Sequence, residues 1–176
     1  MTLGLSLFAF TAVHVVISLI AIVAGLIVMF GLLNSNSMPT LTGLFLLFTI
    51  LTSVTGLMFP FEKLLPSHIL SIISLVLLAI ACFALYGSKL KGGWRATYVV
   101  TAIASLYINM FVLVVQTFLK VPALAAIAPG NPPSGPVFAV VQGIVLVFFV
   151  LVIIGAWRRF KPMAAFATRL SPCRAM

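Results

Sequence analysis

Hydrophobic residues fill five long runs of this chain, separated by short segments rich in turn residues. The runs cover about residues 6–33, 41–59, 67–86, 97–119 and 137–157. A stretch of about 20 apolar residues is long enough to cross the hydrocarbon core of a bilayer as an α-helix. Transmembrane β-strands are only about 10 residues long and alternate in hydrophobicity, unlike these runs. The pattern predicts an all-α integral membrane protein, a bundle of about five transmembrane helices.

Composition agrees with this pattern. Of the 176 residues, 64% are hydrophobic and 6% are charged, whereas a soluble domain carries about 25% charged residues. The length suits a single transmembrane domain, residues 1–160, followed by a basic tail, residues 161–176. The basic residues flank apolar spans and form no soluble surface, so we expect the lipid bilayer as a partner and no nucleic acid.

The distribution of Lys and Arg predicts the direction of the spans. The chain has ten basic residues and one acidic residue, Glu62. Five spans leave Lys63 and Lys120 on one side of the membrane. The other side receives eight basic residues: Lys89, Lys91, Arg95, Arg158, Arg159, Lys161, Arg169 and Arg174. Basic residues accumulate on the cytoplasmic side, so we expect a cytoplasmic C-terminus and an N-terminus outside.

In this orientation most polar side chains of the spans fall in the outer half of the membrane. Asn109, Gln116 and Lys120 share one stripe of their helix, which we expect to face the bundle interior because an unpaired polar group in hydrocarbon costs several kcal/mol. His14 is the only ionisable residue deep within a span, where such residues commonly serve a function. The candidate ligand-binding residues are His14, Asn109, Gln116, Gln142, His68, Glu62 and Lys120.

Two interpretations of this polar cluster stay open. Its members either hydrogen-bond between helices, at about 0.6 kcal/mol for each bond, or line a pocket open to the outer face. We expect His14 to meet the face of Asn109 and Gln116, because the rise per residue gives them similar depths. The loop over residues 121–136 contains five prolines. We expect it to fold over the outer mouth as a lid, with only a short helical turn at 123–128.

Sequence motifs argue against an enzyme. The chain has no nucleophile motif, paired carboxylates or zinc-type spacing of ligands, so we predict no metal site. The expected role is non-enzymatic: binding a small or lipid-like ligand, or serving as an accessory subunit with a membrane protein partner or a second copy of itself.

The alternatives are a haem- or quinone-linked redox module near His14 and a small-solute carrier. No cofactor is predicted outright. By helical rise His14 and His68 differ in depth by about 9–10 Å, which disfavours the two as axial ligands of one haem b and leaves the redox alternative open.

Two segments carry a resemblance. The first segment is Phe59-Pro-Phe-Glu-Lys-Leu-Leu-Pro-Ser-His-Ile69. The other is Phe111-Val-Leu-Val-Val-Gln116, leading into Lys120-Val-Pro-Ala-Leu124. Both resemble a group of small bacterial inner-membrane proteins of no assigned activity. The resemblance implies a multi-pass protein of a bacterial inner membrane and supplies no ligand.

Overall fold

The computed structural model describes residues 6–59 and 66–161, and these residues fold into helices. Five helices are long and apolar enough to cross a membrane. They are α1 (Leu7–Leu33), α2 (Pro39–Leu57), α3 (Pro66–Cys82, continued by the π-helix η1, Phe83–Gly87), α4 (Trp94–Lys120) and α6 (Pro136–Arg159). The prediction of an all-α structure with five helices able to span a membrane is confirmed. A short helix, α5 (Pro122–Ile127), confirms the predicted turn in the loop.

The helix starts follow from the local sequence. Pro39, Pro122 and Pro136 each stand in the first turn of a helix, where the missing backbone N–H leaves no hydrogen bond unmade. The Ser6 hydroxyl caps α1 by accepting the backbone N–H of Ala9 at 3.2 Å. These residues fix the starts of the helices within three residues of the predicted spans.

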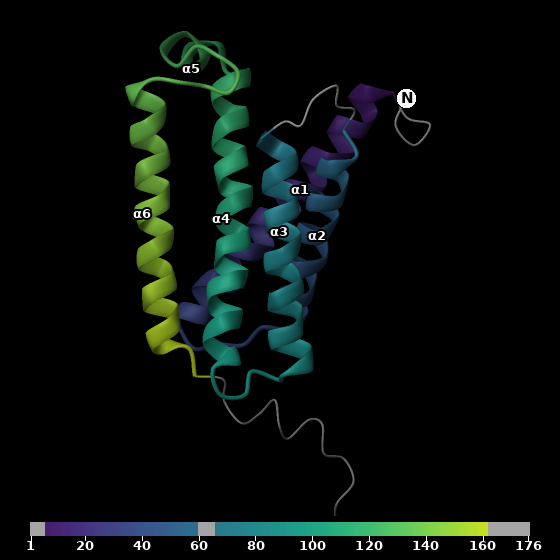
Figure 1. The fold of residues 1–176 in the computed structure, drawn as a ribbon, viewed down its shortest axis with the longest axis vertical. Helices are drawn as coiled ribbons and strands as arrows, with labels where there is room; N and C mark the ends of the chain where they lie inside the picture. The colour runs from purple at the N-terminus through teal and green to yellow at the C-terminus, as the bar shows by residue number, and fades with distance from the viewer. Residues whose placement is uncertain (1–5, 60–65, 162–176) are drawn as a thin grey trace, which may run out of the picture.

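The helices form a bundle in which α1 takes an oblique course. In Figure 1, α2, α3 and α4 stand side by side, α1 crosses behind them, and α6 stands at the edge beside α4. The first turns of α1 lie beside α2, and its last turns reach α6. The two ends of α1 therefore have different neighbours.

Gly25 marks the point where α1 approaches α2 and α4. A Cβ atom there would lie 2.6 Å from Cδ1 of Leu106 on α4 and 2.8 Å from the ring of Phe45 on α2. Any side chain at this position would force Leu106 or Phe45 to move. The buried core spreads from the crossing toward the far end of α1, where Met29, Val99 and Ala102 are at most 1% exposed.

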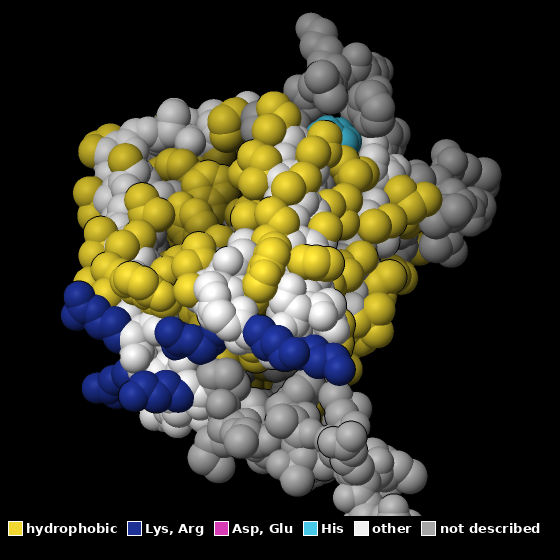
Figure 2. Space-filling view, turned by 60° about the horizontal axis from the view of Figure 1, so that its bottom comes forward, with side chains coloured by type: hydrophobic (Ala, Val, Ile, Leu, Met, Phe, Trp, Pro, Cys, Tyr) yellow, Lys and Arg dark blue, Asp and Glu magenta, His cyan; other side chains and the backbone are white. Residues whose placement is uncertain are grey.

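The outer surface is apolar along the spans and basic at one end. On α6, for example, Val140, Ile144 and Leu151 are 60–65% exposed, as expected of side chains that face lipid. Figure 2 shows Lys and Arg gathered along one edge of this apolar surface. Six of the seven basic residues in the described part lie where α4 begins and α6 ends, which we call the basic end: Lys89, Lys91, Arg95, Arg158, Arg159 and Lys161. Lys120 lies at the opposite end, called here the α5 end.

Candidate functional site

His14, the eighth residue of α1, is held by α2. Its Nδ1 atom lies 2.7 Å from the hydroxyl oxygen of Thr55. The imidazole also meets the ring of Phe59 edge-on, with ring centroids 5.2 Å apart and planes at 89°. Phe59 in turn contacts Phe10, one helical turn before His14, at 5.0 Å. A hydrogen bond and aromatic contacts therefore fix the orientation of the imidazole.

Gly56 makes room for a third helix at this point. A Cβ atom on Gly56 would lie 2.8 Å from the hydroxyl oxygen of Ser71 on α3 and 3.8 Å from Cε1 of His14. Side chains of α1 and α3 thus meet over a glycine of α2. We call this group, His14, Thr55, Gly56, Phe59 and Ser71, the His14 junction. It lies toward the α5 end of the bundle, where α1 begins.

Asn109 and Gln142 are buried elsewhere, on α4 and α6. Each is less than 10% exposed. The Nε2 group of Gln142 donates to the backbone carbonyl of Phe111 at 3.2 Å and so fastens α6 to α4. Within the described part of the chain, Nδ2 of Asn109 and Oε1 of Gln142 are buried without a hydrogen-bond partner. These two residues pack between helices and do not belong to the His14 junction.

The predicted polar stripe of α4 is split. Its later members, Gln116 and Lys120, are exposed and do not face the interior as expected. The cause is helix length. The antiparallel pairing of α3 with α4 includes the ring contact of Phe83 with Trp94, and α3 begins level with about residue 111 of α4 at equal rise per residue. Beyond that level α4 extends past α3, so the stripe loses its neighbour.

The expected meeting of His14 with Asn109 and Gln116 is not formed. His14 bonds to α2, and α1 makes its close approach to α4 at Gly25. Gly25 lies eleven residues further along the chain, about 16 Å at 1.5 Å per residue. Similar depth did not imply contact, because the oblique course of α1 carries its first turns away from α4 (Figure 1).

The remaining candidates are placed as follows. His68, near the start of α3, is 3% exposed and thus buried. Glu62 and Lys63 lie outside the described residues, as does the tail from residue 162. The short helix α5 packs on α4 and lies above α4 and α6 in Figure 1, so it does not cover the His14 junction as a lid would.

Most Ser and Thr side chains of the spans bond to their own helix. Thr49, Thr52, Ser53, Thr101 and Ser105, for example, each donate to the carbonyl four residues earlier, at 2.7–3.0 Å. Such bonds satisfy the hydroxyl without joining two helices. Other hydrogen bonds join side chains of different spans, among them Ser53 with Ser74 at 3.0 Å and His14 with Thr55. In the second of these pairs one member, His14, is an imidazole that can carry a charge.

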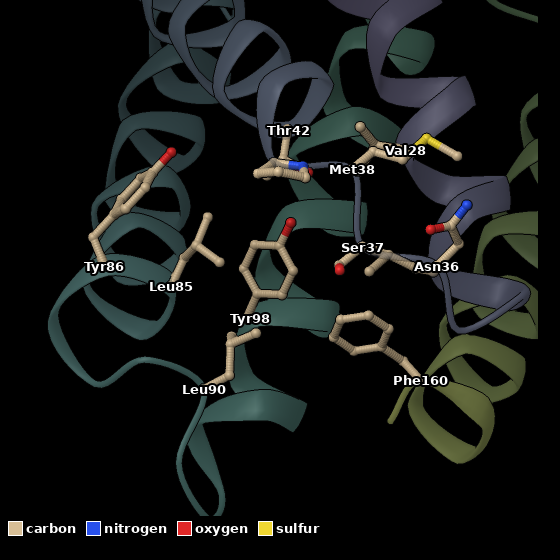
Figure 3. Close-up of a pocket in the computed structure, with 12 residues that line it drawn as sticks. Val28, Asn36, Ser37, Met38, Thr42, Leu85, Tyr86, Leu90, Tyr98 and Phe160 are labelled. Atoms are coloured by element: carbon tan, nitrogen blue, oxygen red, sulfur yellow. The ribbon is translucent and has the colours of Figure 1, made fainter. Parts of the chain in front are cut away.

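A cavity of about 50 Å³ lies at the basic end, opposite the end where we expected a pocket. The Tyr98 hydroxyl points into it toward Thr42, and Phe160 closes one side (Figure 3). Other walls come from η1 and the turn after α1. The volume holds about four waters and falls below the roughly 300–1,000 Å³ of a ligand pocket.

The chain closes this cavity with bonds to the end of α6. Arg95 of α4 donates to the carbonyls of Trp157, at 3.1 Å, and of Phe160. The Ser35 hydroxyl donates to the carbonyl of Arg159 and accepts the backbone N–H of Lys161 at 3.0 Å. The last carbonyls of a helix have no partner within it. Arg95 and Ser35 supply partners and hold Phe160 over the cavity.

Sequence reasoning missed this cavity because it followed polar side chains deep in the spans of the outer half, whereas the cavity is lined mainly by apolar and tyrosine side chains at the other end, with Asn36, Ser37 and Thr42 as its polar members. The available signal was Tyr98, a phenol in the first turns of a span whose hydroxyl needs a polar neighbour. Residues 6–59 and 66–161 contain no group of three or more His, Cys, Asp or Glu side chains placed to hold a metal ion. No family model, curated protein or solved structure matches the chain.

Proposed function

We propose that this chain is a non-enzymatic membrane protein that binds a small or lipid-like ligand at the His14 junction. The observation that carries the proposal is the placement of His14. It is an ionisable residue inside a span, fixed by Thr55 and Phe59, where three helices meet. Ionisable residues in spans are costly and are generally kept for a function. Most Ser and Thr side chains of the spans, by contrast, bond to carbonyls of their own helix and need no ligand.

The packing of the rest of the interior favours a binding protein and argues against a channel for solutes. Between α1, α2 and α4, the side chains around Gly25, Phe45 and Leu106 leave no room for a water molecule. A permanent pore needs a polar passage through the whole membrane. The core therefore favours a ligand that approaches the junction from the bilayer or from the α5 end.

We propose further that the α5 end faces outward and the basic end faces the cytoplasm of a bacterium, in its inner membrane. Six basic residues against one in the described part support this direction, and the resemblance supports the compartment. A reporter active only in the cytoplasm is expected to work after Met176 and to fail in the loop near Asn131. The reverse pattern would mean that the protein has the opposite orientation.

A second candidate is an accessory subunit of a membrane complex. The observation in its favour is α6, which stands at the edge of the bundle. Only 17% of the most apolar stretch of this helix is buried within the protein. Such a helix offers a long face to a partner helix or a second copy. A single stable species containing a second protein, after purification in mild detergent, would favour this role.

Mass spectrometry of molecules that co-purify with the protein tests the proposal. The wild-type protein is expected to retain one amphiphile in a fixed ratio, and His14→Leu is expected to lose it while staying folded. Asn109→Leu is the matched control, a buried polar residue outside the junction, and should retain the ligand. Loss in both variants or in neither would refute the site. A Soret band sensitive to His14→Leu would support the redox alternative instead.

A further inference from the structure

The hydrogen bonds of Thr55 determine which nitrogen of His14 carries the proton. Oγ1 of Thr55 lies 2.7 Å from the carbonyl oxygen of Leu51 and 3.1 Å from that of Thr52. Two oxygens 2.7 Å apart need a proton between them, and a carbonyl has none to give. The single hydroxyl proton of Thr55 therefore goes to its own helix.

It follows that Thr55 accepts from His14. With its proton committed, Oγ1 of Thr55 has only lone pairs to offer Nδ1, 2.7 Å away. Nδ1 must then carry a proton. A second proton would charge the ring inside a span, which is costly. The neutral imidazole with a proton on Nδ1 presents a bare lone pair at Nε2.

The second ring nitrogen, Nε2, is not taken up by the described residues. It forms no hydrogen bond within residues 6–59 and 66–161, and it is not among the enclosed polar atoms of this part. His14 as a whole is half-buried. A polar atom exposed to hydrocarbon without a partner costs several kcal/mol. A donor from outside the protein would remove this cost.

We infer that His14 selects, through Nε2, an amphiphile that donates a hydroxyl group. The apolar body of such a molecule suits the aromatic wall of Phe59 and Phe10. A quinol and a diacylglycerol both carry the required hydroxyl. An oxidised quinone has only carbonyl acceptors and cannot donate to Nε2. This inference rests on the proposed function and narrows its ligand class.

The tautomer is measured first, without any ligand. The full-length protein is labelled with ¹⁵N-histidine, and the His14 signals are assigned by their loss in His14→Leu. Protonated and bare nitrogens of a neutral imidazole have well-separated ¹⁵N shifts, so the expected spectrum has Nδ1 protonated and Nε2 bare. Thr55→Val is expected to abolish this preference. Thr52→Val, a neighbouring hydroxyl bonded only to its own helix, should leave it unchanged.

Four probes then test the ligand class in the same sample: a short-tailed benzoquinol under reducing conditions, its oxidised quinone, its dimethyl ether and dioctanoylglycerol. We expect the quinol or the diacylglycerol to shift the Nε2 signal, and to bind about tenfold more tightly than the ether, the upper range for one neutral hydrogen bond. If only the quinol binds in this way, the hydroxyl comes from a quinol; if only dioctanoylglycerol does, it comes from a diacylglycerol.

The possible failures are distinguishable. A proton on Nε2 in the free protein, or equal affinity for quinone, ether and quinol, would overturn the inference and leave the proposed function standing. Binding of none of the four, together with no co-purifying amphiphile, would overturn both. A Nε2 signal already shifted by water and unmoved by every probe would overturn the inference, and co-purification would still decide the proposed function.

Discussion

The two ends of the bundle are built differently. At the basic end, Arg95 and Ser35 reach across from two other segments to bond the last carbonyls of α6, and Phe160 is 1% exposed. At the α5 end, the His14 junction has one bond between helices, from His14 to Thr55, and a glycine that lets side chains approach. The end of α6 is thus fastened through its backbone groups, whereas at the His14 junction α1 and α2 are joined through a bond between side chains.

This difference distinguishes polar groups that folding requires from polar groups that folding does not require. Bonds to helix-terminal carbonyls satisfy groups that every helix leaves unpaired, so the polar groups of the basic end are accounted for by folding. The His14 junction satisfies no helix terminus. Its polar groups impose a cost inside the membrane that folding alone does not explain. The basic end therefore accounts for stability, and the His14 junction is the site at which we propose ligand binding.

The largest effect on stability is expected from Arg95→Lys. The variant keeps the charge, but its side chain is one bond shorter, so its ammonium cannot take the place of the Nη1 group that bonds both carbonyls. One lost charge-assisted bond at this partly exposed site corresponds to about 2 kcal/mol, measured as a lower melting temperature in detergent. Arg158→Lys, at an exposed position of the same end, is the control. Equal losses in both variants would remove the special role of Arg95.

A smaller effect is expected at the His14 junction, from the contact of Gly56 with Ser71. A new Cβ at position 56 meets the Ser71 hydroxyl at 2.8 Å, so Gly56→Ala forces that side chain to rotate. In a Ser71→Ala background the obstacle is gone. The two changes should therefore couple by about 1 kcal/mol in a double-mutant cycle of unfolding free energies. Additive effects would mean that α2 and α3 do not meet as described.

The smallest effect is expected from Asn109→Leu, between the two ends. The amide is buried with an unpaired Nδ2, and replacing such a group by an apolar one of similar size is nearly neutral. We expect an unchanged or slightly higher melting temperature, by less than about 1 kcal/mol in stability. A clear loss of stability would give Asn109 a role that the contacts of the described residues do not explain.

The fold was largely predictable because span length and turn residues are local properties. Five apolar runs gave five helices, and the prolines at 122, 129, 132, 133 and 136 limited the loop to one short helix. What the sequence could not give was the lateral course of α1. Periodicity places residues on a face of their own helix but does not say which neighbour that face meets. The crossing at Gly25 decides this, and it depends on packing across three helices.

The candidate site was predictable only in part. His14 stood out as an ionisable residue within a span, but its partner Thr55 was one hydroxyl among many with the same local pattern. Gln116 shared a stripe with Asn109, yet it is exposed because α3 begins too late to cover it. Both outcomes depend on where a neighbouring helix starts or crosses, which no periodicity within one helix encodes.

Photo-cross-linking at the two ends tests the central claim most directly. p-Benzoylphenylalanine replaces Phe59 at the His14 junction in one variant and Tyr86, beside the basic-end cavity, in another. After irradiation of intact cells, mass spectrometry is expected to find one defined amphiphile on the Phe59 variant, lost when His14→Leu is added, and only bulk phospholipid on the Tyr86 variant. A defined adduct at position 86, or the same lipids at both positions, would contradict the assignment of binding to the His14 junction.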